Sequence, residues 1–167
     1  YMKKKNIAMC ASRHLSSNVF FKTDIHAYFD SISEERMLKR IHRLQRVKLD
    51  WDVLAELTKA CFYQGRLPIG FITSPVLSDL FLVTLDNKYA KYKRVIYTRY
   101  ADDIIVSFKT EVSDKLLQTE NDIVNIVKTL LSRYGLQING KKTRSFNLNI
   151  SNHIRITGIN ITKASDG

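Results

Sequence analysis

The sequence predicts an α+β domain in which helices interrupt an antiparallel sheet. β-Branched and aromatic runs alternate with stretches of helical periodicity in the order strand, helices, strand, strand, helix, strand, a βαββαβ arrangement. Two of these strands are separated by Tyr100–Asp103 alone, which is typical of a hairpin and makes that pair antiparallel. The 167 residues contain no internal repeat and no Pro/Gly-rich linker, so we expect one domain over residues 1–167.

Composition narrows the class of protein. A hydrophobic fraction of 44% and a charged fraction of 26% are those of a globular protein and exclude disorder and coiled coil. The net charge of +11 favours a phosphate-rich partner or an anionic membrane. Because the apolar runs are far shorter than the ~20 residues of a membrane span, we expect a cytoplasmic protein with no membrane partner. Cys10 and Cys61 lie in no C-x-x-C spacing, which predicts free thiols.

The first half of the chain predicts one strand and two helices. Residues 18–25 (NVFFKTDI) are β-branched and aromatic, as in a strand. Ser31 or Ser33 can cap a helix over about residues 34–47. Asp50 can cap a second helix. Its apolar face is expected to contain Val53, Leu54, Leu57 and Cys61.

The middle of the chain predicts a loop, a buried helix and the hairpin. The loop covers residues 65–70 (GRLPIG). Ser74-Pro75 predicts a helix start, with a hydroxyl cap followed by proline at the first helical position. This helix is apolar on most sides and is expected to be buried. The hairpin strands are expected over residues 94–99 and 104–108.

The last third predicts a long amphipathic helix and two strands. The helix has apolar residues at helical spacing from Val112 to Tyr134, and Gly135 is expected to be its C-cap. The strands are expected over about residues 143–150 and 154–161.

Three acids stand where a basic chain has little structural reason to place them. Asp102 and Asp103 lie at the tip of the predicted hairpin, and Asp24 ends an apolar strand. Neighbouring carboxylates repel unless a cation neutralises them, and Mg²⁺ takes oxygen ligands. Three acids could hold two ions about 3.5–4 Å apart, the arrangement used for in-line displacement at phosphorus. By residue type, however, Asp-Asp at a hairpin tip is also ordinary turn chemistry.

Four motifs in this sequence resemble those of reverse transcriptases. Tyr100–Asp103, in YTRYADDIIVSF, resembles the Y-x-D-D motif, and Asp24, in FKTDIHAYFDSI, resembles the first catalytic aspartate. Residues 67–75 (LPIGFITSP) resemble the motif between them, and residues 135–143 (GLQINGKKT) resemble the one that follows. The resemblance implies an RNA-directed DNA polymerase palm with a ferredoxin-like core.

Two shorter motifs resemble the bacterial retron branch. Residues 10–14 (CASRH) resemble its N-A-x-x-H signature with Cys10 in the Asn place, and residues 156–158 (ITG) resemble its V-T-G signature. Phage-defence and abortive-infection reverse transcriptases share much of this core. Since little sequence precedes Asp24 or follows Gly158, the resemblance implies a fragment, a palm with partial fingers and no thumb. Weak activity, or none, is expected of this fragment by itself.

The resemblance implies roles around the reacting centre. Asp24, Asp102 and Asp103 would be the catalytic acids and, with the backbone carbonyl of Ile25, the ligands of two Mg²⁺ ions. Mn²⁺ suits the same oxygen ligands. Lys142 would lie near the leaving pyrophosphate.

Further residues would contact the nucleotide and the nucleic acid. Backbone N–H groups of Ala27 and Tyr28 would lie beside the triphosphate, and Phe29 would exclude a ribose 2′-hydroxyl. Ile69 replaces the glutamine usual in the family, which removes a polar contact near the incoming nucleotide. The remaining candidates are Gly70 beside the substrate, Tyr100 under the primer end, and Arg40 and Arg43 on the nucleic acid.

The expected partners are an RNA template, a DNA primer, deoxynucleoside triphosphates and a cognate structured non-coding RNA. Arg40 and Arg43 belong to a basic stretch that ends with Arg46 and Lys48, which is either a solvated helix face or a phosphate contact. Two other functions stay open: a template-independent polymerase of the abortive-infection class, to which Ile69 gives some support, and a non-catalytic RNA-binding remnant. His14 has no second His or Cys beside it, so we expect a packed histidine rather than a metal ligand.

Overall fold

The computed structural model describes residues 6–44, 48–91, 95–109 and 116–162. Within them the chain forms two compact units, one made of Ala27–Thr84 and the other of the residues up to His26 together with those from Leu85 onward. Four sequence predictions reach positions outside the described residues: the end of the first helix at Val47, the strand start at Arg94, the start of the long helix at Val112, and the basic residue Arg46.

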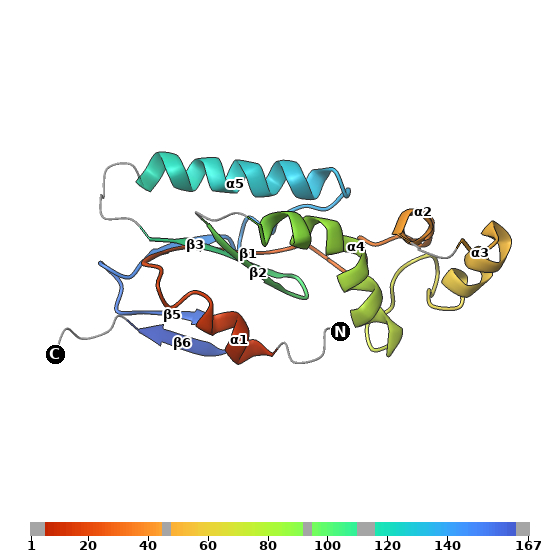
Figure 1. The fold of residues 1–167 in the computed structure, drawn as a ribbon, viewed down its shortest axis with the longest axis horizontal. Helices are drawn as coiled ribbons and strands as arrows, with labels where there is room; N and C mark the ends of the chain where they lie inside the picture. The colour runs from red at the N-terminus through yellow and green to blue at the C-terminus, as the bar shows by residue number, and fades with distance from the viewer. Residues whose placement is uncertain (1–5, 45–47, 92–94, 110–115, 163–167) are drawn as a thin grey trace. The chain divides into compact units, whose positions relative to one another are not determined.

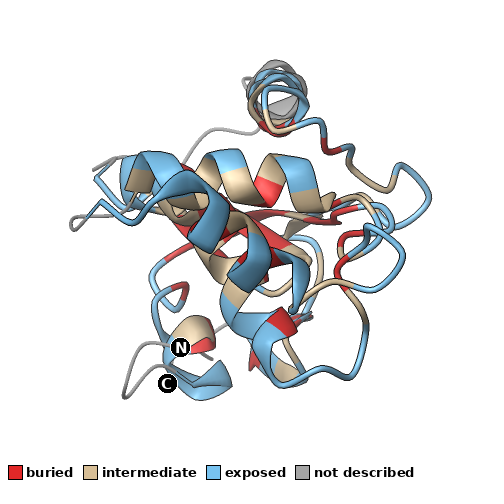
Figure 2. Ribbon diagram, turned by 90° about the vertical axis from the view of Figure 1, so that its right-hand side faces the viewer, coloured by how far each residue is buried: buried red, intermediate tan, exposed pale blue. Residues whose placement is uncertain are grey.

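The second unit is built on an antiparallel sheet. Among the described residues its strands are β1 (Val19–Asp24), β2 (Ile96–Tyr100), β3 (Asp103–Phe108) and β4 (Arg144–Asn147), and they lie in the order β2-β3-β1-β4. The central strands β1 and β3 are buried along most of their length (Figure 2). The predicted α+β fold with helices and an antiparallel sheet is therefore confirmed.

The two faces of this sheet are covered differently (Figure 1). Helix α5 (Leu116–Ser132) lies over one face. Helix α1 (Ile7–Ser12) and a hairpin of β5 (His153–Ile156) and β6 (Ile159–Thr162) lie over the other. The core on that second side consists of Ala11, Phe20, Ile105, Leu148, Ile154, Ile156 and Ile161.

The predicted strand over residues 154–161 is wrong, because the segment is the β5–β6 hairpin. The chain reverses at Thr157 and Gly158, whose φ angles of 44° and 92° are both positive. Positive φ at both central residues is the geometry that suits a two-residue hairpin turn. Isoleucines alternate with other residues on each side of the turn, at Ile154 and Ile156 and again at Ile159 and Ile161. Only the three-residue step from Ile156 to Ile159 marks the turn in the sequence.

The end of α5 is fixed by the glycine that the sequence singles out. The Leu136 N–H donates to the Leu131 carbonyl at 3.0 Å, and the Gly135 N–H donates to the Ser132 carbonyl at 2.8 Å. These two bonds form a Schellman motif around Gly135, whose φ is 61°. The predicted C-cap is confirmed.

The other unit is helical. It contains α2 (Glu34–Leu44), α3 (Trp51–Lys59) and the first part of α4 (Thr73–Tyr89). The predicted cap of α3 is confirmed, since the Asp50 carboxylate accepts from the Asp52 N–H at 2.9 Å. The predicted apolar face of α3 is wrong for Val53 and Leu57, which are exposed. The buried pair is Leu54 and Thr58, because that side of α3 faces inward where it packs with α2.

Helix α4 begins two residues earlier than predicted. It starts at Thr73, so Ser74 is not the cap; its hydroxyl donates to the Pro68 carbonyl at 2.5 Å and ties the preceding loop to the helix. Pro75 lies in the first turn, where a missing N–H leaves no intrahelical bond unmade. The predicted burial holds for Phe81 and Leu85, whereas Val76 is exposed.

Two predictions from composition can be checked directly. Cys10 and Cys61 are free thiols, as predicted. In the part of the chain that the structure describes, no helix has the length and apolar character needed to cross a membrane.

We predict that Gly135→Ala lowers the free energy of unfolding by about 1–2 kcal/mol, because an L-residue with a side chain is strained at positive φ. Gly140→Ala is the matched control, since Gly140 has an ordinary φ and an added Cβ would meet open space. Urea unfolding of both variants is the measurement. An equal effect of the two substitutions would contradict the cap.

Candidate active site

The pairing of β1 with β3 brings the predicted acids together. Asp24 is directly opposite Asp103, and Tyr100 on β2 is directly opposite Asp103 on its other side. Opposite residues of an antiparallel pair present their side chains to the same face. Asp102 precedes β3 at the hairpin tip, and its carbonyl accepts from the Ile25 N–H at 3.0 Å. The tip is thus fastened to the end of β1.

The segment after α5 is fastened to the same end of β1 and brings Lys142 to Asp24. The Asn139 N–H donates to the Asp24 carbonyl, and the His26 N–H donates to the Gln137 carbonyl, each at 2.8 Å. Lys142 Nζ lies 2.5 Å from Asp24 Oδ2. This hydrogen bond and the Asp24 charge, with Asp102 and Asp103 farther off, raise the pKa of the Lys142 ammonium.

Asp24 has a buried carboxylate in which only one of the two oxygens has a hydrogen-bond partner. Its side chain is 7% exposed, and Oδ1 has no hydrogen-bond partner. A buried charged oxygen without a partner is costly, and structures normally satisfy such groups. The pocket in front of it has a volume of about 460 Å³ and is lined by Lys22, Thr23, Asp24, Asp103, Lys141, Lys142 and Arg144.

Asp103 experiences opposing influences. Burial raises the pKa of its carboxyl, and the charges of Asp102 and Asp24 raise it further. Lys22, whose Nζ lies 3.9 Å from Asp103 Oδ2, acts in the opposite direction. Sequence reasoning missed Lys22, although a lysine two residues before Asp24 in an apolar strand points to the same face.

The donor set of this site suits a hard cation. In the described residues no three His, Cys, Asp or Glu side chains come together in a cation-binding arrangement. One oxygen of Asp24 is held by Lys142, and the other has no partner. Carboxylate oxygens are the ligands that Mg²⁺ prefers, so the residues present fit this ion.

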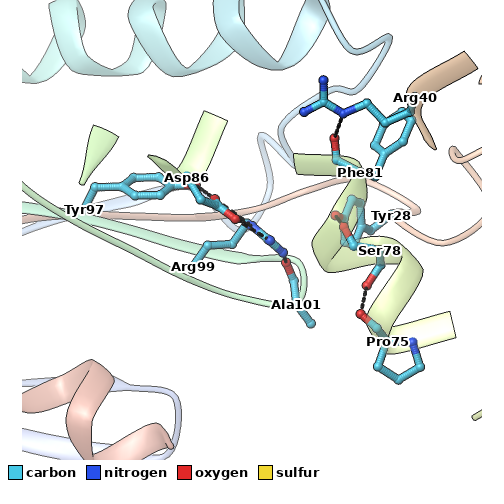
Figure 3. A network of polar contacts seen from close by, with 9 residues as sticks. All are labelled: Tyr28, Arg40, Pro75, Ser78, Phe81, Asp86, Tyr97, Arg99 and Ala101. Carbon is cyan, nitrogen blue, oxygen red and sulfur yellow. Dashed lines mark hydrogen bonds and ion pairs between the residues drawn. The ribbon is translucent and has the colours of Figure 1, made fainter. Parts of the chain in front are cut away.

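A second polar network supports the hairpin that carries Asp102 and Asp103 (Figure 3). Arg99 Nη2 and Nε contact Asp86 at 2.6 and 3.0 Å, and Arg99 Nη1 donates to the Ala101 carbonyl at 2.7 Å. The Tyr97 hydroxyl donates to Asp86 Oδ1 at 2.8 Å. Ala101 has a φ of 51°, so these bonds hold the tip in a conformation that alanine rarely adopts.

His14 is packed, as predicted, and it joins the two hairpin strands. Its Nδ1 lies 2.6 Å from Ser107 Oγ on β3, and its Nε2 lies 2.7 Å from Thr98 Oγ1 on β2. Burial, with a smaller contribution from Arg13, lowers the pKa of His14 to about 4. The neutral ring therefore bridges two hydroxyls beneath the hairpin.

The helical unit contains the predicted nucleotide-binding residues. Tyr28 is buried, and its hydroxyl donates to the Ser78 carbonyl at 2.5 Å (Figure 3). Phe29 packs edge-on against the Tyr28 ring, with centroids 5.7 Å apart. Ala27 has a φ of 44°. These contacts fix the chain from Ala27 to Phe29 within its own unit.

The loop before α4 presents the other two nucleotide candidates. Ile69 is 79% exposed. Gly70 has a φ of 95°, and nothing lies within 4 Å of the position a Cβ would take. Both residues are exposed, and substrate contact stays a prediction for them.

The two predicted arginine contacts differ in their surroundings. Arg40 is half-buried, and its Nε donates to the Phe81 carbonyl at 3.0 Å (Figure 3). Arg43 is exposed on α2. Arg40 therefore has a structural bond on α4, whereas Arg43 is open to solvent; nucleic-acid binding stays a prediction for both.

Comparison with known proteins gives the class of this site. Residues 1–161 match the family described as "Reverse transcriptase (RNA-dependent DNA polymerase)". The chain therefore belongs to the reverse transcriptase family.

The relatives found by sequence include retron reverse transcriptases of Escherichia coli, which confirms the narrower resemblance. The chain is 31% identical to the retron Ec86 enzyme over 146 residues, covering 86% of this chain and 43% of that protein. It is 26% identical to the retron Ec48 enzyme over 161 residues, covering 95% and 38%. The chain thus spans about two fifths of the length of these relatives.

Solved telomerase structures share the fold. Apo telomerase from Candida tropicalis, truncated from its C-terminal domain, matches with a TM-score of 0.63 at 18% identity, over 93% of this chain and 37% of that one. Telomerase from Candida albicans, in complex with a fragment of telomeric RNA, matches with a TM-score of 0.64 at 12% identity, over 93% and 32%. At these identities the likeness is one of fold.

We predict that acid weakens the fold through His14. The unfolded chain takes up a proton below pH 6.5, whereas buried His14 stays neutral down to about pH 4. Stability is therefore lost as the pH falls through this window, by at most about 1.4 kcal/mol per pH unit. Urea unfolding of the native chain and of His14→Gln at several pH values measures it. Parallel pH profiles for the two proteins would contradict the assignment.

We also predict that Asp103→Asn stabilises the fold at pH 7. A raised pKa means that the ionised carboxyl destabilises the folded state at neutral pH and that acid relieves this as the pH falls through that pKa. The gain is on the order of 0.5 kcal/mol, because solvent screens the exposed side of the group. Asp122→Asn on exposed α5 is the control for urea unfolding. A loss of stability specific to Asp103→Asn would contradict the prediction.

Proposed function

We propose that this chain is the polymerase palm of an RNA-directed DNA polymerase, which adds deoxynucleotides to a primer 3′-hydroxyl. The observation that carries the proposal is the facing pair of Asp24 and Asp103, with Asp102 at the adjoining tip, in a chain of the reverse transcriptase family. The strand order β2-β3-β1-β4 in a βαββαβ chain supports the ferredoxin-like core implied by the resemblance.

In this proposal Asp24, Asp102 and Asp103, together with the Ile25 carbonyl, hold two Mg²⁺ or Mn²⁺ ions. When bound, such ions lower the pKa of an attacking hydroxyl and neutralise the charge of the phosphates. The protein's own task is mostly positioning. Asp24 lies at the end of a buried strand and Asp102 at a tip held by Arg99, so both are preorganised.

Substrate contacts follow the roles implied by the family. Ala27 and Tyr28 offer backbone N–H groups to the triphosphate, and Phe29 excludes a ribose 2′-hydroxyl. Gly70 allows close approach of the backbone to the nucleotide, since an open position without Cβ leaves room. Ile69 makes an apolar contact where glutamine is usual.

Nucleic acid is the proposed larger partner. Tyr100 is 55% exposed beside the acids and supports the primer end. Arg43, together with Arg40, contacts phosphates of the RNA template or the DNA primer. A cognate structured non-coding RNA is a further proposed partner, in line with the similarity to retron reverse transcriptases.

The test is incorporation of labelled deoxynucleotides by the protein that contains this chain, with and without primed RNA. We expect RNA-dependent incorporation that Asp102→Ala lowers at least about 100-fold, the scale seen when a group that stabilises transition-state charge is removed. Asp122→Ala, on the exposed surface of α5, is the matched control and should retain activity.

Other outcomes separate the alternatives. Equal incorporation without RNA would favour the template-independent polymerase. RNA binding with no incorporation by the native protein would favour the non-catalytic remnant. Undiminished incorporation by Asp102→Ala would remove the metal-site role of that residue.

A further inference from the structure

We propose that Lys142 is a built-in competitor for the divalent cation, whose ammonium group occupies the Asp24 carboxylate until a cation displaces it. The inference rests on the proposed function, because it takes Asp24 as a metal ligand. The inference concerns this chain's own residues: the Lys142 ammonium must leave the Asp24 carboxylate before a cation binds, and this lowers the affinity of the site for the cation.

The two partners of this ion pair differ in mobility. Asp24 is buried at the end of β1, and its backbone is bonded to the Asn139 N–H, so the carboxylate stays in place. Lys142 has a side chain that is 66% exposed, on the segment that follows Asn139. A lysine side chain carries several rotatable bonds. When something displaces one partner, Lys142 is therefore the one that moves.

The ion pair leaves the Asp24 carboxylate only half used. Lys142 Nζ lies 2.5 Å from Oδ2, while buried Oδ1 has no partner. A divalent cation bound at this carboxylate would lie within a few ångströms of the ammonium group. Both would compete for the same carboxylate, and two positive charges at that separation repel each other. The cation and the Lys142 ammonium therefore exclude each other at Asp24.

The other cationic side chains of the pocket do not have this relation to Asp24. Lys22 lies 3.9 Å from Asp103, beyond hydrogen-bond distance, on the rigid strand β1. Lys141 lines the same pocket, and among the described residues it makes no ion pair. Lys141 differs from Lys142 by one position and carries the same charge, so it is the natural control.

Displacement of Lys142 from Asp24 affects the order in which a cation and an anion bind. The Lys142 N–H donates to the Asn139 carbonyl at 3.0 Å, so the released ammonium stays tethered at the pocket. It can then meet an anion that arrives with the cation, such as a triphosphate. A cation that arrives without its anion must break the ion pair with no replacement, and its binding is weakened accordingly.

The experiment measures Mn²⁺ binding to the nucleotide-free protein that contains this chain, from the free-ion electron paramagnetic resonance signal. We expect Lys142→Met to bind Mn²⁺ about tenfold more tightly than Lys141→Met. Only the substitution at Lys142 removes a charge-assisted hydrogen bond that the ion must otherwise break. Lys142→Arg, which keeps a cation at this position, should bind Mn²⁺ no more tightly than the native protein. Lys142→Gln provides a second neutral variant if Lys142→Met does not fold.

The Mn²⁺ affinities distinguish failure of this inference from failure of the proposed function. Equal Mn²⁺ affinity of Lys142→Met and Lys141→Met, with binding still lost in Asp24→Asn, would overturn the competitor and leave the metal site intact. Mn²⁺ binding that is unchanged in Asp24→Asn would overturn the metal site, and the competitor with it. A nucleoside triphosphate should tighten Mn²⁺ binding more in the native protein than in Lys142→Met.

Discussion

The antiparallel register of β1 against β3 is the constraint on which the site depends. It places Asp24 opposite Asp103, and it equally places Phe20 and Ile105 on the side that packs against α1 and the β5–β6 hairpin. A shift of one residue would turn the core side chains to the opposite face and separate the acids. The same apolar contacts that fold the sheet therefore fix the position of the carboxylates.

This arrangement sets stability against function at the end of the sheet. Strands buried on both sides favour apolar residues, yet both central strands have a carboxylate at this edge. Burial raises the pKa of Asp103, and one oxygen of Asp24 lacks a partner. Such local conflicts are expected at functional sites and are tolerated because the rest of the fold over-determines them. Here the Arg99–Asp86 pair and His14 hold the hairpin from two sides.

The sequence predicted the features that depend on residues close together along the chain, namely individual strands, helices and helix ends. Periodicity located β1 and α5, and single residues such as Asp50 and Gly135 located helix ends, because these effects act within one turn. Local patterns do not give long-range contacts: no local signal marks the ion pair of Lys142 with Asp24, 118 residues away, and only the family resemblance placed both residues near the reacting centre. The segment Ile154–Ile161 suggests one strand because its isoleucines alternate on each side of the turn, and only the three-residue step from Ile156 to Ile159 indicates the turn.

Part of the positive charge of the chain lies directly beside the acids of the candidate site. A net charge of +11 indicates an anionic partner, but the structure also places lysines directly against the acids, Lys142 on Asp24 and Lys22 on Asp103. These ammonium groups supply positive charge that partly neutralises the two carboxylates. In the proposed site, the mobile Lys142 side chain would let a cation and an anionic nucleotide enter together with little net change in local charge. A fixed arginine at residue 142, with its rigid planar fork, would hold the carboxylate more tightly and hinder the exchange.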